Sequence, residues 1–133
     1  MRKKYIVLLA IIVFIAAAAI FAAVQYNSVK ANLDRLSDVT ISDVDLINVE
    51  DGIYEGSYKT FPVSARVRVT VRDHKITAVD LIEHENGQGQ GAEVLPSMVV
   101  ERQTLQLDSI SGATYSSKVI LKAIESALKG AVK

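Results

Sequence analysis

The chain has 133 residues, of which 50% are hydrophobic and 23% charged, and its positive and negative charges balance at neutral pH. This length and composition allow one small domain together with an unusually apolar segment. The sequence has no cysteine, which excludes a disulfide framework, cysteine-ligated iron–sulfur clusters, a lipid-modified cysteine and a thiol nucleophile.

The apolar residues gather near the N-terminus. Residues 5–24 have no charge and no proline, and twelve of them are Leu, Ile, Val or Phe. At about 1.5 Å per residue, a helix of this length spans the ~30 Å hydrocarbon layer of a bilayer. Arg2, Lys3 and Lys4 precede it, and basic residues favour the cytoplasmic side. We predict that residues 1–24 form a single-pass anchor with a cytoplasmic N-terminus and an extracytoplasmic C-terminal domain.

A cleaved signal peptide is the alternative interpretation of this segment. Ala17, Ala18 and Ala19 offer small residues for a cleavage site after an apolar core. The apolar run continues from Ile20 to Val24, which reaches full spanning length and favours the uncleaved anchor. Both interpretations export the same domain.

The segment after the anchor is acidic. Between residues 25 and 51 two basic residues stand against six acidic ones. Val29, Leu33 and Leu36 fall at helical spacing, which indicates that the anchor helix continues for a few turns. We interpret residues 25–50 as a solvated stalk with no acidic binding site.

Residues 51–133 have the pattern of a small α+β domain. Ile53–Tyr58 indicates a strand, and residues 63–72 alternate strictly between apolar and polar, as in a strand with one buried face. Asp73 and His74 make a tight turn, and residues 75–83 return as the hairpin partner. This returning segment is apolar on both faces, at Ile76, Val79, Leu81 and Ile82, so we expect other parts of the protein to pack against each face of the strand.

Two helices follow the predicted strands. Residues 94–102 are expected to be helical, with Pro96 near the start and Val99 facing inward. A final amphipathic helix is expected to begin near Ser116, with its charged stripe in solvent: Lys118, Lys122, Glu125 and Lys129. We therefore predict a small antiparallel sheet packed by two or three helices, preceded by one transmembrane helix. No basic stripe suggests nucleic acid as a partner.

The segment from Asp108 to Ser117 leads into that final helix with small polar residues. A helix start offers unpaired N–H groups and a partial positive charge, which suit a phosphate. Gly112 lets such a group approach the backbone closely. The alternative interpretation is that Thr114 or Ser116 simply caps the helix.

These residues resemble the attachment motif of the FMN-binding domain family, which also occurs in subunits of sodium-pumping NADH:quinone reductases. The resemblance rests on Ser111, Gly112, Ala113 and Thr114, with Asp108 upstream and Ser116 and Ser117 downstream. Tyr115, between them, is also a candidate cofactor-binding residue. In the family the Thr of this motif carries FMN through a phosphoester made by a flavin transferase. The resemblance implies the same role for Thr114.

A glycine-rich loop extends the resemblance. The carried-over residues are His84, Asn86, Gly87, Gly89, Ala92 and Glu93, which match a single-domain subgroup of the family. We predict that FMN lies between this loop and the 108–117 turn. A lone His at a strand end is more often structural than catalytic, and the two histidines lack metal-site spacing.

The resemblance covers residues 51–133 and implies an electron-carrying flavoprotein in a bacterial cell membrane, with redox partners in or outside that membrane. Flavin supplies the electron chemistry, and no substrate-reducing acid–base group is evident in the sequence. Two alternatives stay open. One is a cofactor-free scaffold or adhesion domain, and the other is an FMN-dependent reductase of a small substrate.

Overall fold

The computed structural model describes residues 1–85 and 89–132 and divides into two units, Met1–Asn32 and Leu33–Lys133. The first unit consists of most of helix α1 (Arg2–Ser37). An 18-residue window of α1 has a mean hydropathy of 3.2, and none of this window is buried inside the protein. The helix is therefore long and apolar enough to cross a membrane.

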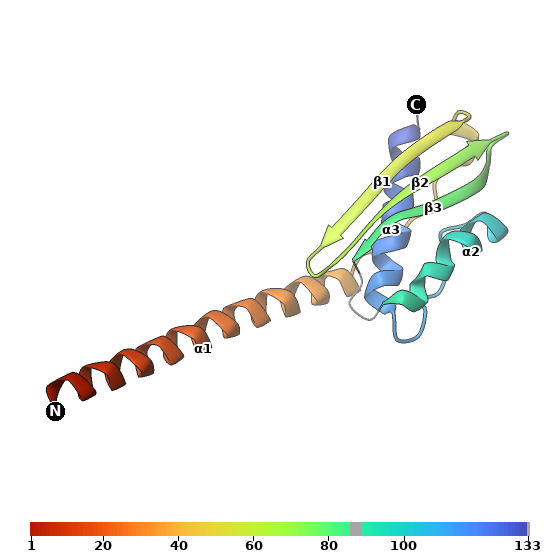
Figure 1. The fold of residues 1–133 in the computed structure, drawn as a ribbon. Coiled ribbons are helices and arrows are strands. Elements are labelled where there is room, and N and C mark those ends of the chain that lie inside the picture. The colour runs from red at the N-terminus through yellow and green to blue at the C-terminus, as the bar shows by residue number, and fades with distance from the viewer. Residues whose placement is uncertain (86–88, 133) are drawn as a thin grey trace. The chain divides into compact units, whose positions relative to one another are not determined.

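The second unit is an α+β domain, as the strand-then-helix pattern predicts. Three antiparallel strands, β1 (Gly52–Thr60), β2 (Val63–Arg72) and β3 (Lys75–Glu85), pair in the order β1-β2-β3. Helix α3 (Thr114–Ala131) packs against β1 and β2, and helix α2 (Leu95–Arg102) packs against β3 (Figure 1). Two short 3₁₀ turns, η1 (Leu46–Asn48) and η2 (Gln90–Val94), complete the elements.

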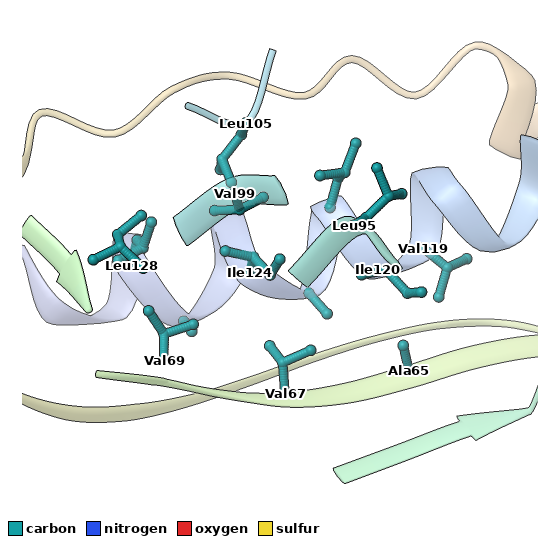
Figure 2. Packing of buried hydrophobic residues seen from close by; sticks show 14 of the residues in the cluster. Ala65, Val67, Val69, Leu95, Val99, Leu105, Val119, Ile120, Ile124 and Leu128 are labelled. Atoms are coloured by element: carbon teal, nitrogen blue, oxygen red, sulfur yellow. The ribbon is translucent and has the colours of Figure 1, made fainter. Parts of the chain in front are cut away.

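The hydrophobic core lies between the sheet and the helices. The apolar residues of β2 alternate as expected, and Ala65, Val67, Val69 and Val71 are at most 2% exposed. Figure 2 shows β2 facing Ile120, Ile124 and Leu128 of α3, with α2 and Leu105 closing the other side. Strict alternation in the sequence thus becomes one buried face, because successive side chains of a strand point to opposite sides.

Helix α3 passes very close to β1 at Gly56. A Cβ atom placed on Gly56 would lie 2.3 Å from the Ala123 oxygen and 2.4 Å from the Ala127 nitrogen. Only glycine allows the two backbones to approach this closely. Gly56 therefore sets how tightly α3 lies on the sheet.

Two β-bulges in β3 explain its irregular apolar pattern. Thr77 and Ile82 are the extra residues, because Val71 pairs with Ile76 but Thr70 with Ala78, and Val67 with Leu81 but Arg66 with Glu83. Because of the two bulges, residues of β3 at uneven spacing pair with the buried residues of β2. Val79, Leu81 and His84 lie opposite Val69, Val67 and Ala65.

The expectation that both faces of β3 are covered is wrong. Ion pairs occupy the outer face of the sheet, between Arg66 and Glu83 at 2.6 Å and between Arg68 and Glu55 at 2.8 Å. These four side chains are 43–66% exposed. The apolar residues at uneven spacing reflect bulges rather than a second buried face.

The turn between β2 and β3, predicted at Asp73 and His74, has a left-handed backbone. Asp73 and His74 have φ values of 51° and 58°. His74 Nδ1 also lies 3.0 Å from the Leu46 oxygen, to which it donates. Replacing His74 with glycine would relieve backbone strain but remove this bond, and the two effects, each about 1 kcal/mol, oppose each other.

Residues 33–50 are part of the folded domain, which corrects their assignment as a solvated stalk. Leu36 is 1% exposed and Val49 is fully buried. The segment 38–44, called the strap below, is bonded to α3 and to the 104–106 segment. Asp43 accepts from the Leu105 N–H and the Thr104 hydroxyl at 2.6 and 2.8 Å.

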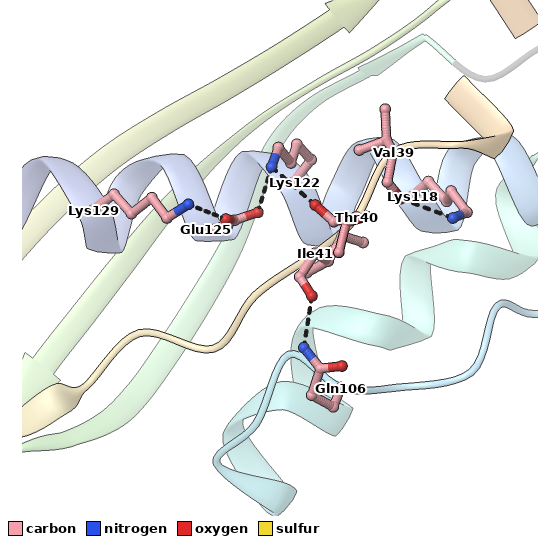
Figure 3. A network of polar contacts seen from close by, with 8 residues as sticks. All are labelled: Val39, Thr40, Ile41, Gln106, Lys118, Lys122, Glu125 and Lys129. Atoms are coloured by element: carbon pink, nitrogen blue, oxygen red, sulfur yellow. Dashed lines mark hydrogen bonds and ion pairs between the residues drawn. The ribbon is translucent and has the colours of Figure 1, made fainter. Parts of the chain in front are cut away.

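The strap lies along the charged stripe of α3, which was expected to face solvent (Figure 3). Lys118 Nζ and Lys122 Nζ donate to the backbone oxygens of Val39 and Thr40, at 2.9 and 3.1 Å. Glu125 is only 1% exposed, between Lys122 and Lys129. Burial alone would raise the pKa of Glu125, but hydrogen bonds from both lysines outweigh it, so that its pKa is lowered.

Candidate functional site

The turn before α3 is fixed from within by Ser117, which is fully buried. The Ser117 hydroxyl accepts from the Ile110 N–H at 2.9 Å and donates to the Ala113 oxygen at 2.7 Å. Gly112 has a φ of 78°, and a Cβ on it would meet nothing within 4 Å. Glycine is therefore favoured at position 112 by the backbone conformation and not by a lack of space for a side chain.

Thr114 is the first residue of α3, so the helix begins two residues earlier than predicted. Ala113 occupies the N-cap position and provides no side-chain hydrogen bond. The Thr114 side chain is exposed, and no described residue accepts from the N–H groups of residues 114–116. The helix start thus offers three open donors and a free path to the Thr114 hydroxyl, which fits an esterified phosphate.

The capping alternative does not describe this helix start. The Ser116 hydroxyl is buried and bonds instead to His84 Nε2 at 2.9 Å. No hydrogen bond joins the Thr114 hydroxyl to a described residue. Neither hydroxyl is therefore used as a cap.

His84 connects the end of β3 to η2 and α3. Its side chain is only 3% exposed, and His84 Nδ1 lies 3.0 Å from Glu93 Oε1. Because a carboxylate only accepts, His84 Nδ1 donates to Glu93, and Nε2 is left to bond to the Ser116 hydroxyl. The bulge at Ile82 makes this possible, since it turns His84 onto the inner face of the sheet.

The glycine loop and the attachment turn lie against each other. A Cβ on Gly91 would be 3.5 Å from Ile110 and 3.9 Å from Ala113. Gly89 is buried and precedes η2, whereas Asn86 and Gly87 lie outside the described residues. The structure thus brings His84, Glu93 and Ser116 together beside the turn.

Most of the remaining predicted residues are on the surface of the turn. Asp108 and Ser111 are exposed, Tyr115 is 39% exposed, and Ala113 is buried. Sequence reasoning did not assign Ser117 its role in fixing the turn, nor Gln103 its role at the sheet edge. The Gln103 amide bonds both to the Ile76 N–H at 2.8 Å and to the Ile76 oxygen at 2.7 Å.

Two cavities of similar size flank this region. The first, about 480 Å³, lies between residues 37–41, residues 105–109 and α3, and we call it the strap cavity. The second, about 490 Å³, lies between residues 78–81 of β3 and α2, with Glu93 at its rim, and we call it the edge cavity. Both volumes fall in the range of small-molecule sites, about 300–1,000 Å³.

The fold and this helix start define an α+β domain in which the exposed Thr114 lies at the uncapped start of a helix. The sequence model of the FMN-binding domain matches residues 63–129, half of the chain. The protein belongs to the FMN-binding domain family, as the attachment motif and the glycine loop indicated.

A sequence relative and a solved structure are similar to this chain. An uncharacterized protein of Treponema pallidum (strain Nichols) is 25% identical over 103 residues, which are 75% of this chain and 29% of that protein. The chain thus spans less than a third of that relative. The crystal structure of the CPE2226 protein from Clostridium perfringens is 23% identical and covers 62% of this chain and 88% of its own, with a TM-score of 0.51.

Proposed function

We propose that this protein is a membrane-anchored, extracytoplasmic flavoprotein that carries electrons through FMN attached to Thr114 by a phosphoester. The observation that carries the proposal is the exposed Thr114 at the uncapped start of α3, within the family's Ser-Gly-Ala-Thr motif. FMN supplies the exchange of one or two electrons.

The chain's own residues supply binding and position. The open N–H groups at the start of α3 hold the phosphate, while Ser117 and Gly112 shape the turn that presents Thr114. His84, bonded to both Glu93 and Ser116, fixes the glycine loop against α3. A flavin transferase makes the attachment, and electron donors and acceptors act at or outside the membrane.

Family membership disfavours the cofactor-free scaffold, since the matched model is that of an FMN-binding domain. The alternative of an FMN-dependent reductase uses the same cofactor, but its electrons pass to a small substrate instead of to a redox partner. Turnover of a small substrate by the purified protein, without a redox partner, would favour the reductase.

The attachment is tested by intact mass and in-gel fluorescence after production beside an active flavin transferase. We expect the wild-type protein to gain the mass of FMN minus water and to fluoresce after denaturing electrophoresis. Thr114→Ala should lose both signals while remaining folded, because the exposed hydroxyl bonds to no described residue and surface changes cost within about 0.5 kcal/mol.

Two neighbouring hydroxyls provide the controls. Ser111 is exposed, so Ser111→Ala is the matched control and should keep the flavin. Ser116→Ala also keeps Thr114 but removes the partner of His84 Nε2, so some loss of stability is expected. Covalent flavin on folded Thr114→Ala, or a wild type that never carries flavin, would contradict the proposal.

A further inference from the structure

One side of strand β3 has no partner strand. The strand order β1-β2-β3 leaves this edge open among the described residues (Figure 1). Antiparallel strands alternate between residues whose backbone groups bond to the partner strand and residues whose groups point away from it. Ile76 points away from β2, because both of its backbone groups bond to the Gln103 amide.

Val79 and Leu81 present open backbone groups at the same edge. The bulge at Thr77 shifts the alternation by one residue, so that Val79 and Leu81 also point away from β2. No described residue bonds to their N–H groups or carbonyl oxygens on that side. The second bulge, at Ile82, ends the regular part of the edge. Residues 78–81 are therefore a stretch of regular strand that can accept a further strand.

The edge cavity lies along this open stretch. Residues 78–81 form one wall, and Pro96, Ser97 and Val100 of α2 line the other. Val79, Leu81 and Val100 are partly buried and pack against the hydrophobic core, so apolar surface remains inside the cavity. Its volume of about 490 Å³ gives room for side chains of an added strand. The cavity thus combines backbone groups on one wall with apolar contacts between the sheet and α2.

The charged residues that line the edge cavity are both acidic. Asp80 is exposed and forms no ion pair with a described residue, since Arg68, opposite it on β2, pairs with Glu55. Glu93 is 46% exposed, and its carboxylate bonds to His84. A basic segment is therefore favoured in this cavity over an acidic one.

We propose that the edge cavity binds an extended, basic segment of another protein, which adds to β3 as a further strand. The N–H groups and oxygens of Val79 and Leu81 bond to its backbone. Directly opposed residues share a face of the sheet, so the residues opposite Val79 and Leu81 are apolar and contact α2. The residue between them lies opposite Asp80 and is lysine or arginine. This binding function goes beyond flavin attachment and does not depend on it.

A second copy of this chain is the competing occupant. Two-fold pairing that uses both Val79 and Leu81 of each copy places the two Asp80 side chains directly opposite each other. Like charges in that position destabilise a strand pair. Strand β1 of a second copy would leave that copy's own β3 edge open, which gives an open-ended assembly instead of a closed one. The acidic edge therefore favours a different, basic partner.

The backbone bonds are tested with a short fluorescein-labelled peptide in which lysine and valine alternate. Fluorescence anisotropy measures its binding to the full-length protein in detergent. Methyl groups on the valine amide nitrogens should weaken binding by about tenfold or more, because these N–H groups donate to Val79 and Leu81. The matched control carries the methyl groups on the lysine amides, which point away from β3, and should bind almost as tightly as the parent peptide.

Charge reversal tests the recognition of a basic segment. Asp80→Lys should weaken binding of the lysine peptide by about fivefold or more and create binding of a peptide with glutamate in place of lysine. Glu101→Lys makes the same change of net charge on α2, outside the cavity, and should leave both affinities unchanged. Both positions are exposed, so both variants should remain folded.

The outcomes separate the two occupants. Loss of binding with valine methylation alone, together with the reversed preference of Asp80→Lys, supports the proposal. A wild type that does not bind the lysine peptide, equal weakening by both sets of methyl groups, or equal effects of Asp80→Lys and Glu101→Lys would overturn it. A dimer in sedimentation experiments that the peptide does not dissociate, and that Ser97→Trp abolishes by filling the cavity, would assign the edge to a second copy instead.

Discussion

Gly56 is a single residue on which the packing of the domain depends. The nearest atoms to a Cβ at Gly56 belong to the backbone of α3, which cannot rotate away as a side chain can. Gly56→Ala should therefore lower the free energy of unfolding by about 3 kcal/mol or more, at the upper end of overpacking costs. Urea denaturation of the folded domain measures this.

Gly130 offers the matched control for Gly56. It lies in the last turn of α3, and a Cβ there would meet nothing within 4 Å. Gly130→Ala should be neutral or stabilise by up to about 1 kcal/mol, because alanine favours the helix. Equal effects of the two substitutions would show that α3 does not lie on β1 as described.

Glu125 makes stability depend on pH. Its pKa is lowered in the folded protein, so its contribution is complete above its ordinary value of 4.5 and is lost as the pH falls through the lowered value. Glu125→Gln should cost about 1.5–3 kcal/mol near neutral pH, the usual range for hydrogen bonds to charged groups. The measurement is urea unfolding of both proteins across acidic pH.

The difference between wild type and Glu125→Gln should shrink in acid, because the wild-type carboxylate then becomes protonated as well. A constant difference at every pH would contradict the ionised pairing with Lys122 and Lys129. The sequence pattern put Glu125 on a solvated stripe, since helical periodicity cannot reveal that the strap lies along it.

At the level of elements, residues 33–50 join the domain through Leu36 and Val49. Leu36, near the end of α1, is 1% exposed in the core of the second unit. Leu36→Ala should destabilise the domain by about 2–5 kcal/mol, as expected for a buried leucine. Thermal or urea unfolding of the full chain in detergent measures the change.

Ile47 provides the comparison within the same segment, because its side chain is 74% exposed. Ile47→Ala should change the free energy of unfolding by no more than about 0.5 kcal/mol. If Leu36→Ala were as mild as Ile47→Ala, residues 33–50 would be a free stalk, as their charge had suggested.

The elements that the sequence predicted well are those with strict periodicity. β2 and the turn at Asp73 and His74 match their predicted residues, because alternation and turn chemistry are local. The bulges at Thr77 and Ile82 could not be predicted, since register depends on the partner strand. For the same reason the sequence indicated His84 as a site residue but could not indicate its hydrogen bonds to Glu93 and Ser116.

For the whole molecule, the proposed function includes an orientation in the membrane. With Arg2, Lys3 and Lys4 in the cytoplasm, a reporter fused after Lys133 should be active only if it functions outside the cytoplasm. A phosphatase and a cytoplasm-dependent fluorescent protein form the matched pair of reporters. Protection of the C-terminal domain from protease in intact spheroplasts would contradict this orientation.

The family and the attachment motif could be recognised from the sequence because the residues of Asp108–Ser117 are contiguous. The strap cavity could not, because it joins residues 37–41 to residues 105–109 and α3, which only the fold brings together. Long-range packing thus decides where the cavities form, while local sequence was enough to indicate Thr114 as the predicted attachment residue.

The Gln103 side chain has a consequence for association between copies of the protein. Its amide bonds to both backbone groups of Ile76 and so acts as a partner strand one residue long at the open edge of β3. Unpaired strand edges are templates for aggregation when copies are crowded together. Gln103 therefore occupies, at the start of this edge, the backbone groups of Ile76 that a strand of a neighbouring copy would need in order to extend the sheet there.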